Sequence, residues 1–188
     1  MSEKTGGVFL DIGANHPCFN NNTAFFEKER DYSGWAFDPL NKYIGLWAEA
    51  RPRTTFVQCA LGEAPGRIAF HETSGEEGWE DQLSYVEVID EADMEAAARA
   101  KSTDVSIVEV KPLREFEVGE IDFASIDVEG FEEMVLKGMF PEIRPKVILV
   151  ENCSFPVGSE RLRKMILSEG YRFHSRVRYI DDLYVREN

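Results

Sequence analysis

Short apolar runs that end in turn-forming or acidic residues alternate with amphipathic segments along most of the chain. Runs of this length indicate buried strands of a parallel sheet, and the longer segments with a 3.6-residue repeat indicate helices. Seven strands are predicted for one sheet, at residues 8–13, 34–37, 55–60, 121–128, 146–150, 171–178 and 182–186. Helices are predicted at residues 22–30, 41–49, 130–137 and 160–168.

The alternation of strand and helix predicts a parallel sheet with helices on both faces and right-handed crossovers. The last two strands follow each other around Asp181 and Asp182, so we expect them to form an antiparallel hairpin. A mostly parallel seven-stranded sheet that ends in such a hairpin is typical of the Rossmann-like α/β fold of class I methyltransferases. That is the fold that we predict.

The middle of the chain departs from this alternation. Additional strands are expected at residues 66–70 and 105–110, and an Ala- and Glu-rich surface helix at residues 91–101. With 188 residues, 43% of them hydrophobic, and no internal repeat, the chain is typical of a single domain over residues 1–188. We expect residues 74–104 to be a variable insertion or a lid.

Composition excludes several classes of partner. A net charge of −14 and a pI near 4.7 disfavour nucleic-acid binding. No run approaches the roughly 18 apolar residues of a membrane helix, and the polar N-terminus lacks a signal-peptide core, so we expect a cytoplasmic protein without membrane contact. Cys18, Cys59 and Cys153 are odd in number and far apart, which favours neither zinc nor disulfides. The oligomeric state is left open.

Polar or turn-forming residues follow each predicted parallel strand, and ligands of open α/β sheets bind at that edge. The expected cofactor-binding residues are Asp11, Gly13, Ala14, Asn15, Asp38, Ala60 and Leu61. Gly13 lets a ligand approach the backbone, Asp11 can hold the amino end of a methionine moiety, and Asp38 can accept both ribose hydroxyls. A dinucleotide needs G-x-G-x-x-G for its pyrophosphate, and residues 11–17 supply one glycine. The pattern therefore favours S-adenosylmethionine (SAM) over NAD.

Three segments together resemble one known family. Residues 121–132 (IDFASIDVEGFE) and 135–138 (VLKG) resemble the signature of the FkbM-family methyltransferases. Residues 9–17 (FLDIGANHP), followed by Asn22 and Thr23, resemble the first motif of one of its sub-groups, and residues 58–62 with Gly66 fit the third-strand pattern. Two features depart from it: Phe131 replaces a small residue, and residues 74–102 match nothing and are expected to determine substrate specificity.

The resemblance implies methyl transfer from SAM to a hydroxyl group of a sugar, glycan or related small molecule, with Asp127 and Glu129 beside the transferred methyl group. The reaction needs aligned reactants and a base for the hydroxyl proton. Asp127, Glu129 and His16 are the candidates. Asp127 and Glu129 are also typical of acids that cap the N-terminus of a helix, and His16 is also typical of a loop histidine that is hydrogen-bonded to the backbone.

Other residues complete the expected site. Glu151 and Asn152 are predicted to contact the acceptor, and Trp79 to stack on a sugar face or to anchor its loop onto the core. Asp127, Glu129 and Glu151 can also form an oxygen cage for Mg²⁺, which we do not favour. Two alternatives to the methyltransferase stay open. One is a non-catalytic SAM-binding partner protein, which needs no carboxylates at the transfer position, and the other is a dinucleotide-dependent oxidoreductase.

Overall fold

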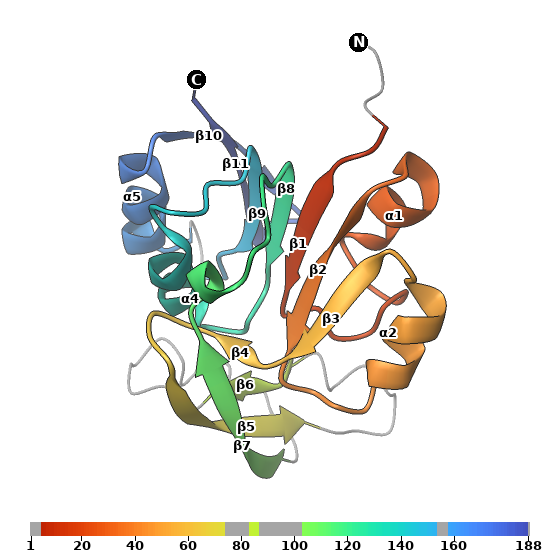
Figure 1. Ribbon diagram of the computed structural model, residues 1–188. Helices are drawn as coiled ribbons and strands as arrows, with labels where there is room; N and C mark the ends of the chain where they lie inside the picture. The colour runs from red at the N-terminus through yellow and green to blue at the C-terminus, as the bar shows by residue number, and fades with distance from the viewer. Residues whose placement is uncertain (1–4, 74–82, 87–102, 154–157, 188) are drawn as a thin grey trace.

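The computed structural model describes residues 5–73, 83–86, 103–153 and 158–187, and its main element is a seven-stranded sheet (Figure 1). Its strands are β1 (Val8–Ile12), β2 (Ser33–Asp38), β3 (Thr54–Gln58), β8 (Phe123–Ile126), β9 (Val147–Glu151), β10 (Tyr171–Val177) and β11 (Asp181–Arg186). They lie in the order β10-β11-β9-β8-β1-β2-β3. The five strands from β9 to β3 are parallel neighbours, and β11 is antiparallel to both β9 and β10. The predicted sheet and its terminal hairpin are confirmed.

Helices cover both faces of this sheet, as predicted (Figure 1). They are α1 (Ala24–Arg30), α2 (Ile44–Ala50), α4 (Glu132–Met139) and α5 (Glu160–Ser168), with a short 3-10 helix at Leu113–Glu115. Ile12 of β1 packs in one core with Leu136 of α4 and Ile166 of α5, whereas Ala36 of β2 packs against Trp47 of α2. In the part of the chain that the structure describes, no helix is both long enough and apolar enough to cross a membrane.

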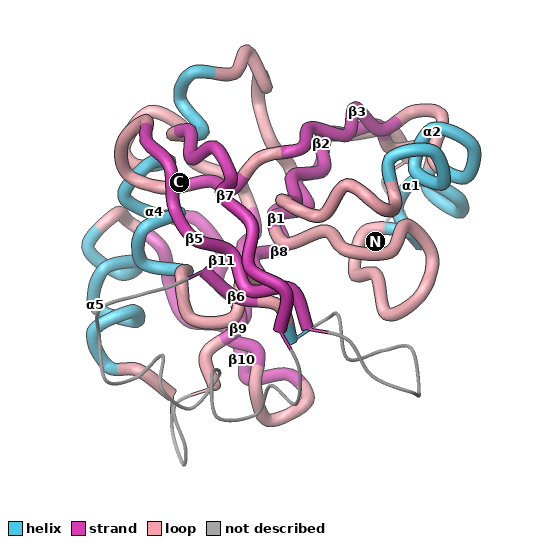
Figure 2. The backbone as a smooth tube through the Cα atoms, turned by 90° about the horizontal axis from the view of Figure 1, so that it is seen from below, coloured by secondary structure: helices cyan, strands magenta, loops and turns pink. Residues whose placement is uncertain are grey.

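A second, four-stranded sheet lies below the first in the view of Figure 1, at the carboxyl ends of its parallel strands, and in front of it in Figure 2. Its strands are β4 (Ala60–Leu61), β5 (Gly66–Thr73), β6 (Tyr85–Val86) and β7 (Thr103–Lys111), in the order β4-β7-β5-β6. The predicted third strand at residues 55–60 is therefore too long: the chain leaves the main sheet after Gln58, and Ala60 pairs with Val110 of β7. The predicted helix at residues 91–101 and Trp79 lie outside the described residues.

The hairpin turn also differs from the prediction. Asp181 and Asp182 are the first residues of β11, and the turn before them contains Arg178 and Tyr179 at positive φ. Asp182 is fully buried, and its charge is compensated there by Arg163, which donates to it from α5. The sequence suggests that these two acids lie in an exposed turn, but both are buried and Asp182 forms ion pairs with Arg163 and Arg176.

Candidate active site

Two adjoining pockets lie at the carboxyl ends of the parallel strands. The first, here called the apolar pocket, spans about 540 Å³ including its opening, and its lining includes Phe37, Leu40 and Leu61. The second, called the polar pocket, spans about 430 Å³ including its opening. Three residues line both pockets: Gly13, Asn15 and Asp127. Asp38, Ala60 and Leu61 line the apolar pocket, and Asp11 and Ala14 the polar one.

The loop after β1 is fitted to the turn after β8. Gly13 has φ +78°, and a Cβ atom there would lie 1.7 Å from the carbonyl oxygen of Asp127. The backbone N–H of Asp127 in turn donates to Ile12 O at 2.9 Å. Glycine is therefore required at position 13 by a neighbouring turn of the same protein, a close approach different from the ligand approach expected from the sequence.

Asp38 ties the same loop to the end of β2. Its Oδ2 accepts a hydrogen bond from Asn15 N–H at 2.8 Å, and its Oδ1 accepts one from Leu40 N–H at 2.8 Å. The side chain is 5% exposed and lies in the wall of the apolar pocket. A carboxylate oxygen can accept two hydrogen bonds, so this arrangement is compatible with a further donor from a ligand.

The turn between β8 and α4 has an unusual backbone. Glu129 has φ +50° and the following Gly130 has φ +103°. A non-glycine residue in this region is uncommon and is often found at functional sites. The turn is held by Glu132, whose Oε1 accepts from Gly130 N–H at 3.1 Å and from Val128 N–H at 3.3 Å.

Glu132 is a residue of the site that the sequence analysis did not single out. Burial raises its pKa to about 7, and the negative charge of Asp127 adds to the rise. The available signal was its position as the last acid of the Asp-Val-Glu-Gly-Phe-Glu segment, residues 127–132. An acid at the start of a helix reads as an exposed, dipole-stabilised residue, and nothing local indicates that it is buried.

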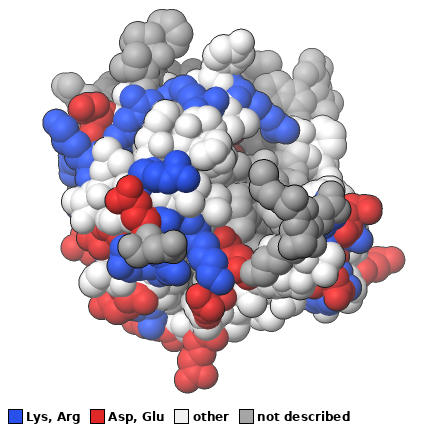
Figure 3. Space-filling view, turned by 90° about the horizontal axis from the view of Figure 1, so that it is seen from above, with Lys and Arg blue, Asp and Glu red and all other residues white. Residues whose placement is uncertain are grey.

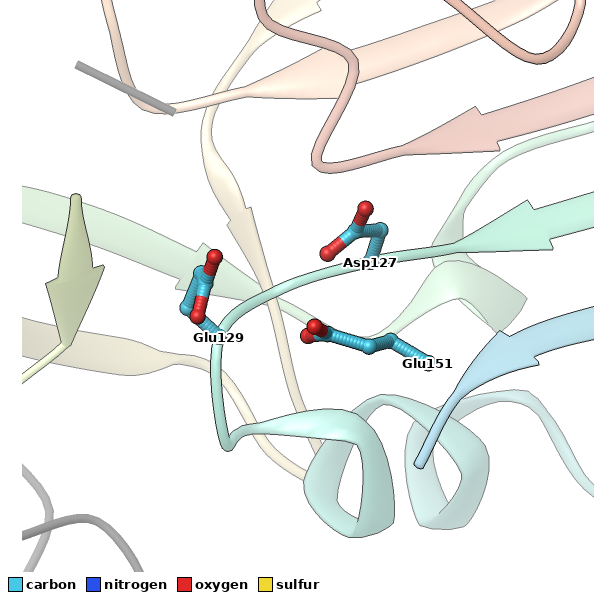
Figure 4. A group of neighbouring side chains, drawn as sticks. All are labelled: Asp127, Glu129 and Glu151. Atoms are coloured by element: carbon cyan, nitrogen blue, oxygen red, sulfur yellow. The ribbon is translucent and has the colours of Figure 1, made fainter. Parts of the chain in front are cut away.

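Asp127, Glu129 and Glu151 form what we call the acid cluster (Figure 4). One carboxylate oxygen of each lies within 4.8 Å of the others. Burial raises the pKa of Glu151 far above its ordinary value, and the charges of Asp127 and Glu129 raise it further. This shift favours the protonated, neutral form of the Glu151 carboxyl. Burial also raises the pKa of Asp181, its neighbour across the ladder, to about 6.

Two other predicted site residues face elsewhere. His16 Nδ1 accepts from the backbone N–H groups of Cys18 and Phe19, at 3.1 and 2.9 Å. Asn152 donates from Nδ2 to Asp182 at 2.9 Å and accepts from Ser159 N–H. Among the described residues that line the two pockets, neither His16 nor Asn152 is present. Their predicted roles as base and acceptor contact stay predictions.

The second sheet supplies part of the lining of the apolar pocket. Phe70 of β5 and Tyr85 of β6 line it together with Phe131. Phe70 and Phe131 pack with Leu40 in a small core of their own. The sequence did not predict this part of the pocket, because the pattern of a strand does not show against which other elements the strand will pack. The large residue at position 131, which departs from the family pattern, fills the junction between the two sheets.

The charges that line the pockets have one sign. Within the described residues, neither pocket is lined by Lys or Arg, whereas Asp11, Asp38, Asp127 and Glu129 all line one or both. On the opposite face, at the amino ends of the parallel strands, basic and acidic side chains are interspersed (Figure 3). The pockets therefore favour a ligand that carries positive charge where it meets these acids.

Comparison with known proteins agrees with the fold. The chain is similar to a crystal structure of an FkbM methyltransferase from Methylobacillus flagellatus, with a TM-score of 0.58 and 17% identity over 98% of this chain and 44% of that one. This chain thus spans less than half the length of that protein. A TehB-like SAM-dependent methyltransferase from Corynebacterium glutamicum has a TM-score of 0.49 and 8% identity over 98% of this chain and 83% of that one.

A third similar structure is the 1,6-didemethyltoxoflavin-N1-methyltransferase of Burkholderia thailandensis, with a TM-score of 0.44 and 15% identity over 96% of this chain and 70% of that one. No curated protein matches the chain. The model of the methyltransferase FkbM domain matches residues 11–173, which include both pockets and the acid cluster. The family expected from the sequence is confirmed, and the chain belongs to the FkbM methyltransferase family.

Proposed function

We propose that the protein is a methyltransferase that transfers a methyl group from SAM to a hydroxyl group of a sugar, glycan or related small molecule. The observation that carries this proposal is the pair of adjoining pockets lined by carboxylates and, within the described residues, by no Lys or Arg. SAM carries two positive groups, a sulfonium and an ammonium, and only one negative carboxylate, so acidic side chains around the pockets attract it. The same field repels the pyrophosphate of a dinucleotide, which disfavours an oxidoreductase.

The described residues fit this cofactor. The apolar pocket offers Phe37 and Leu61 to a flat adenine ring, and Asp38 offers acceptors for ribose hydroxyls. The polar pocket offers carboxylate and amide groups to an amino acid, with Asp127 where the two pockets meet. A bound nucleoside in the first pocket and its amino-acid end in the second would place the sulfonium near Asp127.

The protein itself needs only to orient the reactants and to accept one proton. The cofactor supplies the methyl group for an in-line displacement by the acceptor oxygen. Asp127 and Glu129 are the groups proposed to orient the acceptor and to take its hydroxyl proton. Glu151 is buried beside them, and its raised pKa favours the neutral form, which adds no further negative charge to the cluster. We propose the acceptor class from the family alone, and the cytoplasmic location stays a prediction.

The deciding experiment is transfer of radiolabelled methyl from SAM to a panel of glycans and nucleotide sugars, with wild type, Asp127→Asn and Glu129→Gln. If either acid is the base, its variant loses about 10²-fold or more in turnover, the usual effect of losing a positioned base, while folding and SAM binding persist. Full turnover in both variants would contradict the assignment. SAM binding without turnover on any acceptor would favour the non-catalytic partner protein, and NAD binding without SAM binding an oxidoreductase.

Metal-assisted transfer is a second candidate, because the acid cluster groups three carboxylate oxygens within 4.8 Å. Carboxylate oxygens are the ligands that Mg²⁺ prefers, and a bound ion would ionise Glu151. The Glu151→Gln variant separates the two candidates. It keeps a neutral side chain, so turnover persists if Glu151 is merely protonated, and turnover is lost if Glu151 is a metal ligand. Loss of activity with EDTA and recovery with Mg²⁺ would support the metal.

A further inference from the structure

The residue that ends α2, Arg51, is a fully buried cation that lines neither pocket in the described part of the chain. Its Nε donates to Glu27 Oε2 of α1 at 2.7 Å, and its Nη1 donates to Pro17 O at 2.9 Å. A buried pair of this kind needs every remaining donor to be satisfied. The acceptors of the other guanidinium hydrogens therefore indicate the role of Arg51.

Those partners lie in the Asn-Asn-Thr segment before α1. Nη1 also donates to Asn21 Oδ1 at 3.0 Å, and Nη2 donates to Thr23 Oγ1 at 3.0 Å. With these acceptor atoms facing the guanidinium, the amide hydrogens of Asn21 and the hydroxyl hydrogen of Thr23 are directed away from it. Both reach one atom, Asp11 Oδ2, at 2.8 Å from Asn21 Nδ2 and 2.7 Å from Thr23 Oγ1. The Asn21 amide also donates to Ala14 O at 3.2 Å, and Thr23 Oγ1 lies at the longer distance of 3.0 Å from Asn21 Oδ1.

Asp11 is 4% exposed and lines the polar pocket. Its hydrogen bonds within the described residues all go to Oδ2, which leaves the lone pairs of Oδ1 for a ligand. Burial raises the pKa of Asp11 to about 6, against the opposing effect of the Thr23 and Asn21 hydrogen bonds and the charge of Arg51. The network therefore favours an ionised carboxylate in one fixed orientation at the floor of the pocket.

We propose that Arg51 is a positioning residue for the amino-acid end of the cofactor: it orients Thr23 and Asn21 so that they hold Asp11 with its second oxygen ready to accept from the α-ammonium group of SAM. This inference rests on the proposed function. Arg51 touches neither cofactor nor substrate in this assignment, and its effect passes through two side chains. The alternative is that Arg51 only fastens the loop between β1 and α1 to α2.

Two ligands separate these roles: S-adenosylhomocysteine, which has the amino-acid end, and 5′-methylthioadenosine, which lacks it. The variant Thr23→Val removes the hydroxyl between Arg51 and Asp11 and leaves the Arg51–Glu27 pair in place. By calorimetry we expect about tenfold weaker binding of S-adenosylhomocysteine, as for a lost charge-assisted hydrogen bond. Binding of 5′-methylthioadenosine should change by less than about twofold. The conservative variant Thr23→Ser should restore the wild-type affinity for S-adenosylhomocysteine.

Thr54→Val is the matched control, because the Thr54 hydroxyl donates to Glu27 in the same network without reaching Asp11. It should alter neither affinity. Arg51→Lys keeps the charge but loses the forked donors, and it should reproduce the selective loss wherever it folds. Equal losses for both ligands in Thr23→Val, or no loss for either, would overturn the positioning role. A wild-type protein that binds neither ligand would instead refute the proposed function, and the inference with it.

Discussion

Replacing Glu132 by glutamine should make the protein more stable at alkaline pH. The glutamate is 9% exposed, and burial raises its pKa from 4.5 to about 7. Because the folded pKa lies above the unfolded one, the folded state binds more protons than the unfolded state, and stability falls as pH rises from about 4.5 to about 7. At about 1.4 kcal/mol per pKa unit, the charged side chain costs up to about 3 kcal/mol above that window.

Glutamine keeps the carbonyl oxygen that can accept from the Val128 and Gly130 N–H groups, and it removes the charge. Urea unfolding should show Glu132→Gln more stable than wild type by up to about 3 kcal/mol at pH 8, and within about 1 kcal/mol of it at pH 4.5. Glu133→Gln is the matched control, because Glu133 pairs with Arg161 near the surface and such a pair contributes little. The reasoning would be refuted if the difference in unfolding free energy between Glu132→Gln and wild type were the same at both pH values, or if the variant were less stable than wild type at pH 8.

Two further predictions concern the remaining site residues. Asp38→Ala should weaken S-adenosylhomocysteine and 5′-methylthioadenosine alike, each by about tenfold or more in calorimetry, because both ligands carry the ribose; unchanged affinities would place Asp38 outside the site. His16→Asn should keep turnover within about threefold of wild type, since an asparagine oxygen can replace Nδ1 as acceptor for the Cys18 and Phe19 N–H groups. A loss of about 10²-fold in the methyl-transfer assay would instead identify His16 as the base.

The sequence was most informative where one residue pattern has one structural consequence. Apolar runs such as residues 146–150 predict buried parallel strands, and the carboxyl ends of such strands meet at one edge. The positions of Asp38 and Asp127 beside one pocket follow from this rule alone. The predicted hairpin followed likewise from two short strands with a brief interval between them.

Long-range pairs left no such signal. Arg51 and Glu27 are 24 residues apart, and each belongs to a short helix whose charged residues read as solvent-facing. The pairing of β5 with β7, which helps to line the apolar pocket, joins segments on either side of residues 74–102, which match no pattern of the family. Side-chain direction was equally hidden: Asn152 follows β9 directly, yet its amide is bound by Asp182 and Ser159.

The carboxyl groups at the strand ends make the fold less stable than it could be. Burial raises the pKa of Asp11, Glu132, Glu151 and Asp181, and each such acid disfavours the folded state as pH rises toward neutrality. Neutral side chains of the same size would remove this effect, so packing does not account for these acids. A ligand with positive charge in the polar pocket, which Asp11 lines, would oppose this effect at Asp11, because its field lowers the pKa of that acid and its binding stabilises the folded state. On the proposed function, the ammonium group of SAM supplies that positive charge beside Asp11, so bound S-adenosylhomocysteine should stabilise the folded protein more than 5′-methylthioadenosine does.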